Sequence, residues 1–173
     1  MTAAAACLGL ALPAVAQSGA VAGAVPGAAS DAPSAAWLSR MFAVSESGGA
    51  ALPVDAPSPV ARSLALWDVL RRPARAGTAP FPLDLQARFI LDHGGWPGLA
   101  AIRRRAEAQA ADPLTPDADA LAFFRQVAPQ SAEAQARFAL LSAGGAANDL
   151  ARAAWVRPGL GPDREQALLA RFA

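Results

Sequence analysis

Short apolar segments with helical spacing, each closed by Pro, Gly, Ser or Thr, fill the chain from Pro59 to Ala173. Each segment is about ten to fourteen residues long, and its large apolar side chains recur every three or four residues, which is the period of one helical face. No segment alternates apolar and polar residues over the length that a half-buried strand needs. The pattern therefore predicts an all-α chain without a sheet.

The breaks between these segments predict seven helices joined by short turns, over residues 59–72, 82–95, 98–110, 115–128, 131–145, 148–159 and 161–173. Thr115 is the expected N-cap before Pro116, and Ser131 and Asn148 are expected to begin the next two helices. Short turns favour antiparallel hairpins stacked side by side. The predicted architecture over 59–173 is thus an irregular α-superhelix, or solenoid, that is tetratricopeptide-like but has no strict repeat.

Spacing also predicts which side chains face the core. The expected buried stripes are Val60, Leu64 and Trp67; Leu85 and Phe89; Leu99, Ile102 and Ala106; Leu121, Phe124 and Val127; and Leu168, Leu169 and Phe172. The last helix ends in "ALLARFA", which lacks the polar face that a terminal repeat needs for solubility. We therefore expect further protein sequence after Ala173.

The N-terminal region is predicted to be exported and then disordered. Residues 1–16 contain the apolar run "AAAACLGLALPAVA", which ends in an A-x-A cleavage pattern and is too short to span a bilayer, so they are interpreted as a signal peptide for the periplasm. Cys7 lies inside it, and a mature chain without cysteine has neither a disulfide framework nor a thiol nucleophile. Residues 17–58 are rich in Ala, Gly, Pro and Ser and predict a disordered linker, with one short helix over Ala35–Phe42.

Composition excludes several kinds of chemistry. Fifteen basic and fourteen acidic side chains nearly cancel, which argues against nucleic acid or a membrane surface as partner. A single histidine, His93, cannot form a metal site, the absence of lysine rules out a phosphate-binding loop, and no cofactor is implied. Glu46 falls in a Ser/Gly stretch, whereas Glu107, Glu133 and Glu165 are expected on solvent faces. No residue is therefore assigned a catalytic role.

The stretch "LDHGGWPGLAAIRRRAE", residues 91–107, concentrates the unusual residues of the chain. His93 is expected to cap a helix structurally, and Trp96 to plug the turn or, as the alternative, to stack on a sugar. Arg103, Arg104 and Arg105 cover more than half a helical turn and are either solvated and ion-paired, as Arg103 with Glu107, or a basic rim that contacts an acidic polymer. These four residues, Trp96 and the three arginines, are the candidate ligand-binding residues.

Three segments resemble a known family. "FILDHGGWPGLAAIRRRAEAQ" (Phe89 to Gln109), "DPLTPDADALAFFRQVAPQSAEAQARFAL" (Asp112 to Leu140) and "ARAAWVRPGLGPDREQALLARF" (Ala151 to Phe172) are similar to the N-terminal α-helical region of alphaproteobacterial soluble lytic transglycosylases. The resemblance rests on the Trp-Pro turn, the arginine run and the Ala-Trp hairpin.

The resemblance implies a superhelical arm in front of a lysozyme-like catalytic domain that cleaves the MurNAc–GlcNAc bond of peptidoglycan and leaves anhydromuramoyl ends. Glu46-Ser47 is the one Glu-Ser pair, but it lies before the arm and has no Gly-Leu-Met-Gln segment after it, so the catalytic role is not carried over. The expected function is a non-catalytic arm that positions glycan strands and is inactive alone. The alternative is a free-standing tetratricopeptide-like periplasmic adaptor for an envelope protein.

Overall fold

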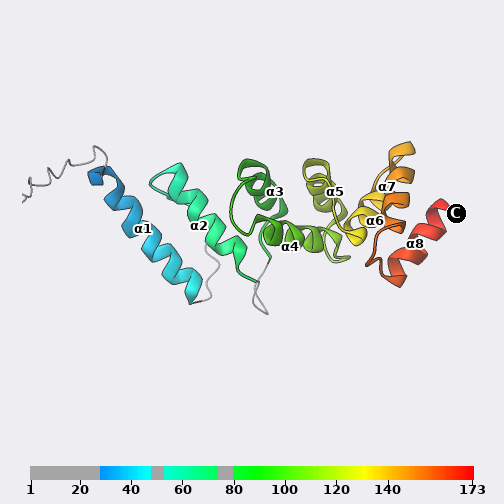
Figure 1. Ribbon diagram of the computed structural model, residues 1–173, viewed down its shortest axis with the longest axis horizontal. Coiled ribbons are helices and arrows are strands. Elements are labelled where there is room, and N and C mark those ends of the chain that lie inside the picture. The colour runs from blue at the N-terminus through cyan, green and yellow to red at the C-terminus, as the bar shows by residue number, and fades with distance from the viewer. Residues whose placement is uncertain (1–27, 48–52, 74–79) are drawn as a thin grey trace, which may run out of the picture.

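The structure is a computed structural model that describes residues 28–47, 53–73 and 80–173. Within these ranges the chain is all α-helical and has no strand (Figure 1). The helices are α1 (Ala28–Glu46), α2 (Pro59–Arg71), α3 (Leu83–Asp92), α4 (Leu99–Ala111), α5 (Asp117–Gln126), α6 (Ala132–Leu141), α7 (Gly145–Trp155) and α8 (Pro162–Phe172). The all-α prediction is confirmed.

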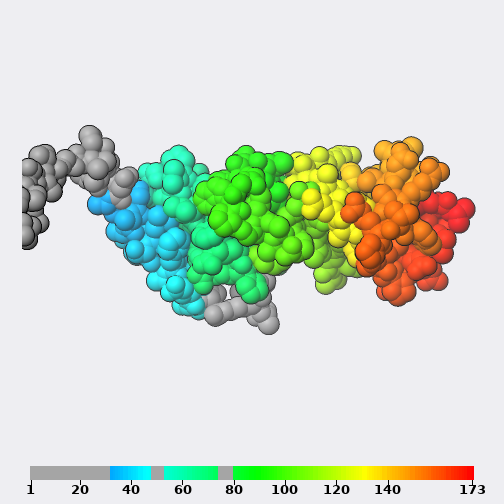
Figure 2. Space-filling view, viewed as in Figure 1, coloured from blue at the N-terminus to red at the C-terminus, as the bar shows by residue number. Residues whose placement is uncertain are grey.

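The helices follow one another in chain order along the longest axis of the molecule, from α1 at one end to α8 at the other (Figures 1 and 2). Each helix packs on near neighbours. Among the described helices, α1 packs on α2 alone, α5 packs on α3, α4 and α6, and α6 also contacts α7 and α8. Contacts therefore pass along the chain from one helix to its near neighbours.

The helices agree approximately with the expected segments, but only one of the three expected helix starts, Ser131, is confirmed. Ser131 caps α6, because its side chain accepts a hydrogen bond from the backbone N–H of Ala134. Thr115 is not a cap: Pro116 occupies the N-cap position of α5, and the Thr115 hydroxyl donates to the carbonyl oxygen of Gln109 instead. Asn148 does not begin α7 either, since Gly144 is the N-cap and its φ of 75° suits glycine.

Two clusters of buried side chains form the core. The larger one is built from side chains of α2 through α6, and its largest fully buried side chains are Ile102, Phe123 and Phe124. The smaller one joins α6, α7 and α8 through alanines and Leu168. Each large buried apolar side chain contributes about 1.5–3 kcal/mol to the stability of the fold.

Two of the predicted core positions are wrong. Val60 is exposed, because α2 turns the face with Ala61, Ala65 and Val69 inward. Leu169 is half exposed, since Leu168 alone takes the buried position of that pair on α8. Two small alanines, Ala61 and Ala65, lie on the buried face of α2, and apolar spacing that is weighted toward large side chains misses them.

Helix α1 corrects part of the linker prediction. The short helix expected over Ala35–Phe42 extends over Ala28–Glu46, so this part of the predicted disordered range 17–58 is helical. Alanine favours helix strongly, and Trp37 and Phe42 are half-buried on a helix that packs on α2. The predicted signal peptide, residues 1–16, and Cys7 lie outside the described residues. Within the described ranges, no helix combines the length and apolar character that crossing a membrane requires.

Candidate functional site

His93 joins α3 to α2. Its Nδ1 lies 3.1 Å from the carbonyl oxygen of Phe89 and its Nε2 lies 2.9 Å from Oγ of Ser63. Because a carbonyl oxygen can only accept, Nδ1 carries a proton and donates it to the Phe89 carbonyl, while Nε2 and the Ser63 hydroxyl share a second hydrogen bond. The imidazole also stacks on the Phe89 ring, with centroids 4.3 Å apart. These contacts give His93 the structural role that its position at a helix end predicts.

Trp96 packs among other aromatic rings at the same turn. Its ring is edge-on to those of His93, Phe89 and Trp67, at centroid distances of 4.7, 5.8 and 6.3 Å. The Trp67 indole N–H donates to the carbonyl oxygen of Pro97 over 2.7 Å, which holds the turn against α2. Trp96 is half-buried and therefore fills the turn as a plug; contact with a sugar stays a prediction.

The three consecutive arginines have different environments. Arg103 donates to the carbonyl oxygen of Ala128 and, through Nε, to Glu107 Oε1 at 3.1 Å. Arg105 donates to the carbonyl oxygen of Leu70, and burial, followed by the charge of Arg104, lowers the pKa of its guanidinium. Arg104 is exposed and makes no hydrogen bond or ion pair with the part of the chain that the structure describes. Of the three, Arg104 alone is fully available to an external polymer.

Glu107 corrects a sequence prediction, because it does not lie on a solvent face. The residue is only 2% exposed. Oε2 accepts hydrogen bonds from the backbone N–H groups of Gln130 and Ser131, each over 3.0 Å, and Oε1 pairs with Arg103. Glu107 therefore ties α4 to the turn before α6, and both of its oxygens are occupied.

The remaining glutamates do not converge on a site either. Glu133 accepts from the backbone N–H of Gly161 over 2.5 Å and lies 3.4 Å from Nε of Arg164, which joins α6 to α8. Glu46 is the exposed last residue of α1, so the prediction that it lies in a flexible stretch is wrong. Glu165 is exposed on α8, as predicted. In the described ranges, no group of three or more His, Cys, Asp or Glu side chains could hold a metal ion.

A groove of about 910 Å³ lies between the start of α3, the second half of α4 and α5. Its apolar lining includes Phe81, Phe123 and Leu114, and Leu114 is 92% exposed. Arg105, Gln109 and Thr115 provide polar groups within it. Sites of this size and mixed character take extended small molecules or short polymer segments.

Hydrogen bonds fix the walls of the groove. Gln86 Nε2 donates to the carbonyl oxygen of Phe81 over 2.9 Å and to Gln109 Oε1 over 2.8 Å. Gln109 Nε2 donates to the same Phe81 carbonyl over 2.9 Å. The segment before α3 is thereby held against α4, so the groove exists before any ligand arrives.

Aspartates surround the groove. Asp84, Asp112 and Asp119 all line it, and all three are exposed, while Arg105 is the one basic side chain among its lining residues. The carboxylates accept hydrogen bonds, so they suit hydroxyl and amide donors, and they oppose a strongly anionic ligand. Recognition here would depend on apolar contact and hydrogen bonds more than on ion pairs.

Sequence reasoning found Arg105 but missed the rest of this groove. Phe81 and Gln109 come from different segments that meet only when α3 packs on α4. One signal was present in the sequence: Leu114 is a large apolar residue in the turn "DPLTP", where nothing in the local pattern buries it.

No family model, curated protein or solved structure matches this chain.

Proposed function

We propose that this chain is the non-catalytic helical arm of a periplasmic lytic transglycosylase, an irregular α-superhelix that positions peptidoglycan glycan strands. The parent activity is cleavage of the MurNAc–GlcNAc bond with formation of anhydromuramoyl ends. The groove between α3, α4 and α5 is the proposed strand site, and its size and preformed walls are the observation on which this assignment depends.

The layout of the helices supports the arm assignment. The three segments that resemble the family fall on successive pairs of helices: Phe89 to Gln109 spans the α3–α4 turn, Asp112 to Leu140 spans α5 and α6, and Ala151 to Phe172 spans the α7–α8 turn. A series of hairpins in chain order offers an extended surface along which a polymer can lie.

The side chains of the groove suit a saccharide chain. Phe81 and Leu114 offer apolar surface to the C–H faces of sugar rings, and Gln109 and Asp119 supply polar groups to hydroxyls and acetamido groups. Because Arg103 and Arg105 already donate to backbone carbonyls, the predicted basic rim is reduced to Arg104. We therefore expect strand binding to depend only weakly on salt, since one exposed ion pair contributes about 0.2–1 kcal/mol.

Cosedimentation with purified sacculi tests this proposal. Wild-type chain should bind, and Leu114→Ser should weaken binding severalfold without a change in helical content, because the side chain is exposed and contributes little to folding. Val60→Ser is the matched control, since Val60 is also an exposed apolar residue but lies on α2 outside the groove. Equal binding by both variants would remove the groove from the proposal.

The proposal also predicts that the isolated chain has no peptidoglycan-cleaving activity. Glu107, the most buried glutamate of the described residues, has both oxygens engaged by the fold. Incubation with sacculi should release no anhydromuropeptides, measured by mass spectrometry of the soluble fraction. Their appearance at a rate proportional to protein concentration would overturn the non-catalytic assignment.

A free-standing tetratricopeptide-like adaptor is the alternative, and the exposed apolar Leu114 beside three aspartates favours it. Such a groove also suits a protein segment with apolar and basic side chains. Absence of any binding to sacculi by a folded chain would select the adaptor over the arm.

A further inference from the structure

The turn "DPLTP", residues 112–116, forms one wall of the proposed strand groove and carries the exposed Leu114 into it. Hydrogen bonds within the turn set its shape. Asp112 Oδ1 accepts from the backbone N–H of Leu114 over 2.8 Å, and the Thr115 hydroxyl donates to the carbonyl oxygen of Gln109 over 2.6 Å. Two arginines from more distant helices then attach the turn to the rest of the chain.

Arg164 on α8 holds the start of the turn. Its Nη2 donates to the carbonyl oxygen of Ala111, the last residue of α4. Carbonyl groups at the end of a helix lack partners within that helix, so they need such a donor. Nε of Arg164 lies 3.4 Å from Oε2 of Glu133 on α6, and the Arg164 side chain is only 15% exposed. One guanidinium therefore joins α4, α6 and α8.

Arg137 on α6 holds the end of the turn. Its Nη2 donates to the carbonyl oxygen of Thr115 over 3.1 Å and to Oδ1 of Asp117, the first residue of α5, over 2.5 Å. Arg137 is buried, and the fixed planar donors of a guanidinium can hold a carbonyl and a carboxylate together. The turn is thus anchored on both sides of Leu114.

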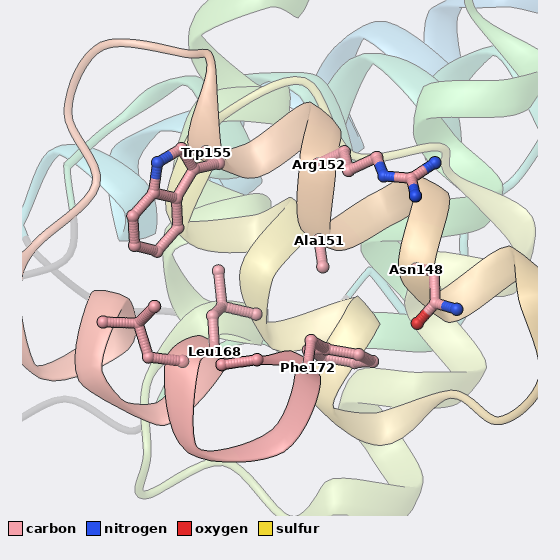
Figure 3. Close-up of a pocket in the computed structure, with 8 residues that line it drawn as sticks. Asn148, Ala151, Arg152, Trp155, Leu168 and Phe172 are labelled. Atoms are coloured by element: carbon pink, nitrogen blue, oxygen red, sulfur yellow. The ribbon is translucent and has the colours of Figure 1, made fainter.

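These two arginines lie outside the groove. Among the described residues, neither α6 nor α8 contributes to the lining of the groove between α3, α4 and α5. Helix α8 is itself fixed through Leu168, which lies in one buried cluster with Ala151 and, in Figure 3, points from α8 toward α7. Arg164 is four residues before Leu168 and shares its face of α8. Both arginines can therefore affect a bound strand only through the turn.

We propose that Arg137 and Arg164 are positioning residues of the strand groove, which keep the 112–116 turn and its Leu114 in place for the ligand. The inference rests on the proposed strand site and adds the residues that hold its wall. A wall that is already in place avoids the cost of ordering it on binding. When an anchor is lost, a smaller fraction of the molecules has the wall in place, and the apparent affinity falls in proportion.

Titration calorimetry of the full chain with purified glycan-strand fragments tests this role. Arg164→Gln should bind about threefold or more weakly than the wild type. Arg171→Gln is the control and should bind as the wild type does, because Arg171, also on α8, donates to the carbonyl oxygens of Leu140 and Ser142 at the end of α6, away from the turn. Arg164→Lys should not restore full binding, since a single ammonium nitrogen does not reproduce both contacts of the guanidinium.

A double-mutant cycle separates positioning from general support of the fold. In the Leu114→Ser background, Arg164→Gln should weaken binding little further, because the arginine acts through the turn that carries Leu114. Should Arg164→Gln fail to fold, Arg164→Lys takes its place in the cycle. Wild-type affinity in the Arg164 variant, or an equal loss in both backgrounds, would overturn the positioning role and leave the strand site intact. No binding by a folded wild-type chain would overturn the strand site and this inference with it.

Discussion

Replacing Glu107 with glutamine removes one buried negative charge and changes almost nothing in side-chain volume. In the wild type this carboxylate accepts two backbone N–H groups over 3.0 Å and the Arg103 Nε over 3.1 Å. The glutamine amide has one acceptor oxygen and one donor nitrogen. Whichever way it turns, its nitrogen must face either Arg103 or the N–H groups of Gln130 and Ser131, so donor meets donor at one side.

The expected loss of unfolding free energy follows from the burial of Glu107. Hydrogen bonds to charged groups contribute about 1.5–3 kcal/mol each, and removal of one member of a buried ion pair costs about 3–5 kcal/mol. Arg103 retains 25% side-chain exposure and can turn to solvent, which reduces the cost. We therefore expect Glu107→Gln to lower the free energy of unfolding by about 2–4 kcal/mol and, for a chain of 173 residues, to lower Tm by about 4–16 °C.

Thermal unfolding followed by circular dichroism measures this change. Glu165→Gln is the matched control, because Glu165 is exposed on α8, and it should stay within about 0.5 kcal/mol of the wild type. In a double-mutant cycle, Arg103→Gln should cost less in the Glu107→Gln background than in the wild type. A Tm for Glu107→Gln equal to that of the control would refute the structural role given to this carboxylate.

Three further outcomes are expected. Burial alone would raise the pKa of Asp68, but hydrogen bonds from Arg72, Arg71 and Ser45 hold this pKa below its ordinary value of 3.8. The contribution of Asp68 to stability is therefore present above pH 3.8 and lost as the pH falls below it. Urea midpoints measured between pH 7 and pH 2 should show a steeper loss of stability in acid for the wild type than for Asp68→Asn. Ser131→Ala should lower the free energy of unfolding by about 0.5–2 kcal/mol through loss of the α6 N-cap, and an unchanged urea midpoint would contradict the cap. Arg105→Gln should cost about 1–2 kcal/mol because its bond to the Leu70 carbonyl is lost, whereas Arg104→Gln should leave Tm unchanged, and the reverse order would contradict the assigned environments.

Local sequence patterns predict the helices of this chain well. The order and approximate bounds of α2 to α8 follow from apolar spacing and from Pro, Gly and Ser at the breaks, because these act within a few residues. The cap at Ser131 and the buried positions of Ile102 and Phe124 follow in the same way. All of these features can be inferred from the pattern of residues within a few helical turns.

Features that depend on long-range contacts could not be predicted. Glu107 looks like a solvent-face residue on its own helix, and only the turn at Gln130 and Ser131, more than twenty residues away, buries it. In the sequence Arg105 is likewise only one member of a basic run, and its hydrogen bond to the carbonyl oxygen of Leu70 depends on the packing of α4 on α2. The groove exists because Phe81 and Gln109 meet, which no periodicity within either segment encodes.

Hydrogen exchange measured by mass spectrometry, with and without purified glycan-strand fragments, tests the proposed strand site most directly. We expect slower exchange in residues 80–84 and 105–126, which contain the lining of the groove between α3, α4 and α5, with little change in α7 and α8. Unchanged exchange at saturating fragment concentration, or protection confined to helices outside this groove, would contradict the assignment of this chain as a glycan-positioning arm.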